Sequence, residues 1–281
     1  MRDSFYGWYM KCQSDTQTLA VIPAIHQAGK KTTCSIQIIS DDGVWAVSFP
    51  SQAFRQTNQT IYIGENRFSK DGIHFNMKTP KLTVKGRLRF GSLSPLKYDI
   101  MGPFALIPFM ECRHSVWSMH HAVCGMISIN EQIYSFQNGT GYWEGDRGRS
   151  FPKVYAWTQC FFKGVSLMLS VADIPFAGTH FTGIIGIVLW QNHEYRLATY
   201  LGAKAVKIES GILRIAQGDM ELEAQLLKSA DRPLMAPDNG CMTRTIHESA
   251  SCEASYRFRK GGRILFAFKT SSASFEYEYP F

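Results

Sequence analysis

The stretch that decides the fold is IHFNMKTPKLTVKGRLRF, residues 73–90. Apolar and polar side chains alternate twice within it, over 73–78 and again over 82–90, and Thr79-Pro80 separates the two runs. Alternation with a period of two places the apolar side chains on one face of a β-strand, and proline cannot donate a hydrogen bond to the ladder. The segment therefore predicts two strands, each with one buried and one hydrated face.

The same organisation extends along the chain. Short sequences rich in Gly, Asn and Asp separate apolar runs at 40–43, 70–72, 130–131, 191–192, 210–211, 217–219 and 260–262. These residue types tolerate the positive φ angles of tight hairpins. Helical periodicity is scarce, and 220–228 alternates like a strand, whereas 92–112 and 229–240 resemble long ordered connections. Many short strands at this spacing predict a sandwich or an antiparallel barrel.

Composition agrees with a folded β protein of one large domain or two ordinary ones. The 281 residues are 45% hydrophobic and 19% charged, which is enough apolar material for a packed core. Aromatic residues make up 13% of the chain. They suit β cores in general, and they also suit the lining of a ligand cavity, so both interpretations stay open.

The net charge of +7 favours anionic partners or an anionic membrane surface. No basic run is present, so we expect no nucleic-acid partner. The densest group of basic residues is Lys78, Lys81, Lys85, Arg87 and Arg89.

The cysteines and the first residues predict a compartment. The seven cysteines are an odd number without a C-x-x-C pair, which favours free thiols in a reducing environment. The sequence opens without the apolar region of a signal peptide. Its longest apolar stretch, 181–190, is about half of the ~20 residues that a membrane-spanning helix needs. We therefore expect a cytoplasmic protein whose membrane contact, if any, is peripheral.

The most unusual segment is NGTGYWEGDRGRSFPKVYAWTQ, residues 138–159. It begins Gly139-x-Gly141, but Glu144 stands where a dinucleotide-binding fingerprint has its third glycine, and no phosphate-loop Gly-Lys-Ser/Thr follows. If the backbone stays extended, one face carries Tyr142, Glu144 and Asp146, and a second face carries Tyr155, Trp157 and Gln159. We predict that both faces meet the same interior.

This segment resembles the signature of the tocopherol cyclase family. The shared pattern is Gly-Tyr-x-Glu-x-Asp-x-Gly-x-Ser-Phe-Pro-x-x-Tyr-x-Trp-x-Gln, over 141–159. FYGWY at 5–9 is similar to the aromatic-Gly-Trp-Tyr opening of that family, and weaker matches lie at 175–178, 195–200 and 242–248. Only the middle motif is specific. Arg147 replaces a usual Trp, and Cys160 replaces a usual Asn.

The resemblance implies an all-β chain of two tandem lipocalin-like antiparallel barrels or sandwiches packed together, with domains at 1–152 and 153–281. It implies an apolar cavity for a prenylated quinol or another isoprenoid, without a cofactor. It also implies a ring closure in which an acid protonates a prenyl double bond and a phenol oxygen traps the cation. A non-catalytic lipocalin-like carrier of a hydrophobic ligand is the alternative, since fold does not fix function.

Such chemistry needs a protonated acid in a dry, aromatic pocket. Water would capture the cation, aromatic faces stabilise it by about 0.5–2 kcal/mol each, and burial keeps a carboxyl group protonated. We expect Glu144 to be the proton donor, because an arginine beside Asp146 would make that carboxylate structural. The expected ligand-binding residues are Trp8, Tyr142, Trp143, Arg147, Arg149, Tyr155, Trp157 and Gln159.

A second candidate segment is ECRH at 111–114. Glu111 and His114 are candidates for an acid or base role, and a buried pair of Glu111 with Arg113 is the structural alternative. A metal site would use Glu111, His114 and either His120 or His121. Because a spacing of three suits a helix and this region reads as loop and strand, we predict no metal site here.

Overall fold

The structure is a computed structural model that describes residues 3–57, 59–107, 110–176, 178–229 and 232–280. Within these ranges the chain is nearly all β-strand, with three short 3-10 helices and no α-helix. All of the strand pairs described are antiparallel and form two large sheets, so the all-β prediction is confirmed. Both sheets end in strands that are not hydrogen-bonded to one another, so they are open and not closed barrels. No helix in the described part of the chain is long and apolar enough to cross a membrane.

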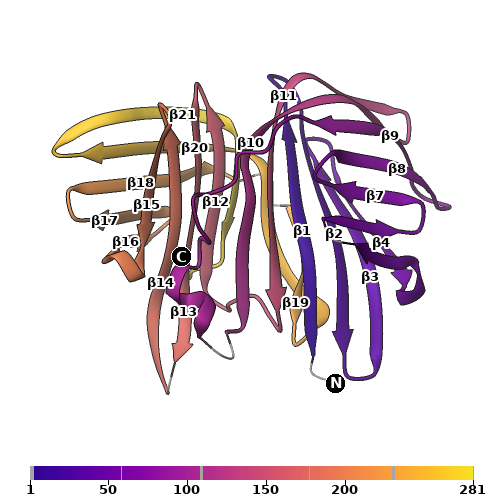
Figure 1. Cartoon of the computed structure of the whole chain (residues 1–281), viewed down its shortest axis with the longest axis horizontal. Helices are drawn as coiled ribbons and strands as arrows, with labels where there is room; N and C mark the ends of the chain where they lie inside the picture. The colour runs from indigo at the N-terminus through magenta and orange to yellow at the C-terminus, as the bar shows by residue number, and fades with distance from the viewer. Residues whose placement is uncertain (1–2, 58, 108–109, 177, 230–231, 281) are drawn as a thin grey trace. The chain divides into compact units, whose positions relative to one another are not determined.

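The first sheet has eleven strands in the order β4-β3-β2-β1-β11-β10-β9-β8-β7-β6-β5. Their bounds are β1 Ser4–Gln13, β2 Thr18–Ala28, β3 Lys31–Ser40, β4 Val44–Pro50, β5 Phe54–Thr57, β6 Thr60–Ile63, β7 Asn66–Ser69, β8 Gly72–Lys78, β9 Thr83–Phe90, β10 Cys112–Ile129 and β11 Gln132–Gly148. Strands β1–β3 run steeply across β7–β9 (Figure 1), and the sheet curls until β3 contacts β6. The concave side holds an apolar core that includes Trp8, Met10, Ile36, Phe68, Phe75, Val84, Leu88, Phe136 and Trp143.

The second sheet follows the order β15-β14-β13-β12-β21-β20-β18-β17-β16, and β19 pairs with β20 beside this path. Its strands are β12 Tyr155–Phe162, β13 Val165–Phe176, β14 Thr179–Trp190, β15 His193–Ala198, β16 Lys204–Glu209, β17 Ile212–Gln217, β18 Met220–Lys228, β19 Arg232–Asp238, β20 Cys241–Lys260 and β21 Arg263–Tyr277. The 3-10 helix Thr199–Leu201 follows β15, and β14 contacts β16. A second apolar core includes Ala156, Cys160, Leu167, Val188, Leu213, Leu222, Phe258 and Phe275.

The chain divides into two compact units that exchange two segments. The first unit contains Met1–Lys97, Met110–Phe151 and Met235–Arg244, and the second contains Tyr98–Phe109, Pro152–Leu234 and Thr245–Phe281. The main boundary between the two units in the sequence therefore lies between Phe151 and Pro152. The predicted domains 1–152 and 153–281 stay a prediction.

Residues with positive φ angles account for most of the predicted hairpins. One predicted connection, which contains prolines, is a strand instead. Asn130, Gln191, Asn192 and Ser210 have positive φ angles at three of the predicted turns. The expectation that 229–240 is a connection is wrong, because this region contains β19. Its prolines are compatible with a strand because β19 pairs with β20 alone, and an edge strand tolerates proline.

In the connection after β9, the residues that belong to the second unit are held by Arg196 of that same unit. This connection contains the 3-10 helix Gly102–Leu106 and no strand up to residue 107. The guanidinium of Arg196 donates hydrogen bonds to the carbonyl oxygens of Tyr98 and Asp99, each at 3.0 Å, and also lies 3.6 Å from the centroid of the Tyr98 ring. A buried cation bonded in this way orders a segment that has no ladder of its own.

The glycines of 138–159 have a steric cause. A Cβ atom at Gly145 would lie 2.6 Å from the carbonyl oxygen of Gly7 on β1 and 2.6 Å from the ring of Trp117 on β10. A Cβ atom at Gly148 would lie 2.0 Å from the carbonyl oxygen of Glu111. The glycines let neighbouring backbone and a tryptophan ring lie against β11, and they do not form a ligand loop.

We expect Gly145→Ala to lower the free energy of unfolding by about 2 kcal/mol, because overpacking forces neighbouring groups apart. Urea denaturation followed by tryptophan fluorescence measures the change. Gly29→Ala is the control, since a Cβ there meets nothing within 4 Å and only its positive φ of 57° is unfavourable, at about 1 kcal/mol. Equal losses in both variants would contradict the steric explanation.

Candidate active site

The predicted acids lie on one face of β11, at the centre of the first sheet. Regular pairing with β1 places Tyr9 opposite Glu144 and Lys11 opposite Tyr142. On the other side, β10 places His114 opposite Asp146. Directly opposed residues project from the same face, so three strands contribute to one polar group.

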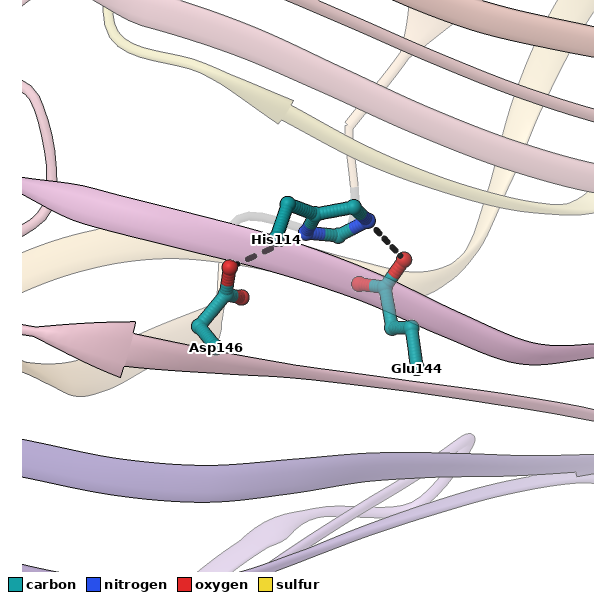
Figure 2. A group of neighbouring side chains, drawn as sticks. All are labelled: His114, Glu144 and Asp146. Carbon is teal, nitrogen blue, oxygen red and sulfur yellow. Dashed lines mark hydrogen bonds and ion pairs between the residues drawn. The ribbon is translucent and has the colours of Figure 1, made fainter. Parts of the chain in front are cut away.

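His114 joins the two carboxylates (Figure 2). Its Nδ1 lies 3.0 Å from Oδ1 of Asp146 and is hydrogen-bonded to it, and its Nε2 lies 2.9 Å from Oε2 of Glu144. The second contact has the distance of an ion pair. The hydroxyl of Tyr142 donates a short hydrogen bond to the same Oε2 of Glu144. The Sγ of Cys112 donates to Oδ1 of Asp146 at 3.3 Å.

Burial and charge set the protonation of this group. Burial alone would lower the pKa of His114, but the carboxylates of Glu144 and Asp146 outweigh it and raise that pKa well above the usual 6.5. Burial raises the pKa of Glu144, although His114 and the Tyr142 hydroxyl oppose the shift. Both directions favour the protonated forms, which are an imidazolium at His114 and a carboxyl group at Glu144 that keeps its proton to higher pH than usual.

The tryptophans lie on the other face of the same strands. Trp143 packs against Trp8 and Trp117 in the core of the first unit, with ring centroids 4.9 and 5.0 Å from its own. Because side chains alternate along β11, Trp143 points away from the face that carries Glu144. The sequence-based expectation grouped Trp8 and Trp143 with the acid, and the structure separates them. Tyr142 and Tyr9 are the aromatic residues beside Glu144 on its own face, and Phe5 lies further along that face, opposite Gly148.

The arginines do not pair with the central acid. Arg147 and Arg149 are exposed, and Arg149 donates to Oδ1 of Asn239 at 3.2 Å. The expectation of an arginine-paired Asp146 is wrong, since the side chains bonded to Asp146 are His114 and Cys112. The twist and register of β10 bring a histidine to this position instead.

The segment 111–114 contributes His114 and Cys112 to the group. Glu111 is exposed, so the alternative of a buried pair with Arg113 is wrong. His120 is exposed as well, and His121 is buried with its Nδ1 3.0 Å from the hydroxyl of Ser118. Among the described residues, the alternative metal-ligand set of 111, 114 and 120 or 121 does not come together.

A different set has the spacing of a metal site. One ligand atom each from His114, Glu144 and Asp146 lies within 4.8 Å of the others. These are ligand types for divalent cations. The carboxylates, however, contact different ring nitrogens, and a metal ligand must be a neutral imidazole. A cation here would have to displace the proton of His114, so the arrangement suits proton transfer better.

A related polar group lies in the second unit. Tyr155, Trp157 and Gln159 alternate on β12, and Trp157 lies opposite Glu276 on β21. The hydroxyl of Tyr155 donates a short hydrogen bond to Oε2 of Glu276, and Glu248 lies opposite Glu276 on β20. The amide of Gln159 is buried, and neither its oxygen nor its nitrogen has a hydrogen-bond partner among the residues that the structure describes.

Sequence reasoning missed Tyr9, Lys11, Glu248 and Glu276 as neighbours of the predicted residues. Glu276 had a signal, since it is an acid in an aromatic alternating strand, SFEYEY at 274–279. The two predicted faces lie in different units, so their meeting in one interior stays a prediction.

The fold and this face define a two-lobed all-β protein with a buried acid–base group. No protein-family model matches the sequence, and no curated protein matches it. Among solved structures, the chain is similar to an AttH-type protein from Nitrosomonas europaea, with 12% identity and a TM-score of 0.55 over 100% of this chain and 93% of that one. It is also similar to CghA in complex with Sch210972, with 10% identity and a TM-score of 0.63 over 99% and 89%.

A further similar structure is kievitone hydratase from Nectria haematococca, with 9% identity and a TM-score of 0.57 over 99% of this chain and 90% of that one. At such identities these likenesses establish the shared fold, and residues must carry any functional argument.

We expect His114 to remain protonated at pH 7.5 and Asp146→Asn to lower its pKa, because the variant removes a negative charge that favours the imidazolium. Imidazole ¹⁵N–¹H NMR of the full chain measures both. Asp219→Asn, which breaks an exposed ion pair with Lys260, is the control and leaves His114 unchanged. An imidazole that is neutral at pH 7.5 in the unmodified protein would refute the assigned charge state.

Proposed function

We propose that the protein is a tocopherol cyclase-like enzyme that binds a prenylated quinol or a related isoprenoid and protonates its alkene through Glu144. The observation that carries the proposal is the buried carboxyl group of Glu144, whose pKa is raised and which His114 links to Asp146. A raised pKa lets a carboxyl group keep its proton to higher pH, which is what a general acid requires.

The reaction is a balanced isomerisation. Glu144 transfers its proton to the less substituted alkene carbon, which leaves a tertiary cation on the other carbon. The phenol oxygen of the same molecule forms a C–O bond to the cation, and the phenolic proton then returns to Glu144. No oxidant, reductant or cofactor enters this balance.

The neighbours of Glu144 stabilise the carboxylate that proton transfer leaves behind. Tyr142 already donates a hydrogen bond to its Oε2, and the Nε2 of His114 lies 2.9 Å from the same oxygen. Asp146 holds the histidine ring by its Nδ1 and balances its charge. Preorganised donors of this kind reduce the cost of the charge that develops in the transition state.

Shared fold gives this proposal limited support. One similar structure is named as a hydratase, and addition of water to an alkene begins with the same protonation and differs in the nucleophile that captures the cation. In a cyclase, the site must therefore exclude water from the cation. The ring of Tyr9 lies opposite Glu144 in the ladder, and an aromatic ring that faces the cation would stabilise it by about 0.5–2 kcal/mol.

The second candidate function is a non-catalytic carrier of a hydrophobic ligand. The buried amide of Gln159 favours it, because an amide without partners costs free energy unless a ligand supplies them. Tyr155 and Trp157 on the same face of β12 would then contact that ligand, and proton transfer would have no part.

We expect Glu144→Gln to lower turnover of a prenylated hydroquinone by about 10²–10⁴-fold and to leave binding within a few-fold, since the amide keeps the shape but cannot donate the carboxyl proton. Chromatography with mass spectrometry measures the chromanol product, and tryptophan fluorescence measures binding. Glu131→Gln, in an exposed turn, is the matched control and keeps full activity. If the unmodified protein binds the hydroquinone and never converts it, the carrier interpretation is correct.

Tyr142→Phe gives a test based on pH. Its hydroxyl lowers the pKa of Glu144, so the variant raises that pKa further. Activity that needs protonated Glu144 is present below this pKa and is lost above it. We therefore expect the alkaline limb of the kcat profile to move to higher pH, while kcat itself falls because one donor to the carboxylate is gone. An unchanged limb would remove Glu144 from the proton-transfer step.

A further inference from the structure

Almost all of the net charge of the protein comes from one short segment. Residues 54–90 contain eight Lys or Arg residues and only two acids, Glu65 and Asp71, while the whole chain has a net charge of +7. This segment forms β5–β9, and both acids lie in turns between these strands. The strands themselves carry no acidic side chain.

The register gathers these basic side chains on the outer face of the first sheet. Arg67 on β7 lies opposite His74 on β8, which lies opposite Arg87 on β9. Lys85 lies opposite Asn76 in the next row, and Arg89 is two residues beyond Arg87 on the same face. The alternate residues of these strands, Ile73, Phe75, Val84 and Leu88, are in the apolar core, so the basic side chains point to solvent.

Most of these charges are not neutralised by the protein. Asp71 pairs with Arg67 at 3.3 Å. Within the described part of the chain, no ion pair reaches Lys78, Lys85, Arg87 or Arg89, and all four are exposed. The outer face therefore keeps a strong positive potential, which attracts anions over about a Debye length.

Exposed apolar side chains border the basic residues. Met126 on β10 lies opposite Arg87 and is 56% exposed, and Ile133 on β11 is 55% exposed. Ile133 pairs with Ser128, which pairs in turn with Lys85. Large apolar side chains between cations are unfavourable in water, but they are favourable in the headgroup region of a bilayer.

We propose that the outer face of β7–β10, with Lys78, Lys85, Arg87, Arg89, Met126 and Ile133, docks on an anionic lipid surface. Basic side chains near such a surface each add binding free energy, and Met126 and Ile133 add apolar contact. Nucleic acid would use the same charges but would leave the apolar side chains in water. The nearby aromatic ring suited to base stacking, Tyr62, is covered by the guanidinium of Arg55 at 3.9 Å. The inference does not depend on the proposed catalytic function.

Vesicle sedimentation of the full chain tests the proposal. We expect binding to vesicles of phosphatidylcholine with 30% phosphatidylserine (roughly the anionic-lipid regime of a polybasic contact) and much weaker binding to phosphatidylcholine alone. The variant Lys85→Gln, Arg87→Gln, Arg89→Gln should bind about 100-fold more weakly, which is about five-fold for each basic residue. The double variant Met126→Ser, Ile133→Ser should weaken binding that remains at high salt.

The matched control removes the same charge from the second unit. Lys204→Gln, Arg263→Gln, Lys269→Gln replaces three exposed basic residues and should bind like the unmodified protein. Equal loss in both triple variants would mean that total charge, and not this face, drives binding, and would overturn the proposal. Binding to a 30-base-pair DNA duplex without binding to anionic vesicles would also overturn it. Circular dichroism confirms that each variant is folded.

Discussion

The central constraint on this structure is the repulsion between two carboxylates that β11 carries side by side. Glu144 and Asp146 are two residues apart on one face of an extended strand, and Glu144 is buried. Two ionised carboxylates in this position would be strongly unfavourable. The chain reduces this repulsion by placing His114 from the adjacent strand between the two carboxyl groups. The acid–base group therefore depends on the register of β10 with β11.

The register in turn depends on residues that have no charge. Gly145 lies between the two acids and lets Trp117 lie against β11, and Gly148 lies against the backbone at Glu111. On the concave face, Trp143 packs between the rings of Trp8 and Trp117. Packing of the apolar face fixes the register of the strands, because a slip by one residue would move every side chain to the opposite face of the sheet. The polar group therefore takes its geometry from the core behind it.

The predictable part of this fold is local. Alternation in 73–90 and the turn residues at 130–131 and 191–192 identify strands and hairpins, because their information lies within a few residues. Alternation also correctly placed Glu144 and Asp146 on one face. The partner of Asp146 was not predictable in this way, since His114 is 32 residues away and pairing depends on a register with bulges between β10 and β11. Proximity in sequence favoured arginine, but Arg147 points to the other face.

The same histidine both holds the acid in place and increases its strength as an acid. His114 lowers the pKa of Glu144, while burial raises it, and the raised pKa shows that burial is the larger effect. A pKa that is too high would make Glu144 a poor donor to an alkene, and one that is too low would leave it without its proton at neutral pH. Because folding raises the pKa of both His114 and Glu144, their contribution to stability is present in acid and is lost as the pH rises through these values. The pairing of His114 with Glu144 therefore destabilises the fold least at the pH values at which Glu144 carries its proton.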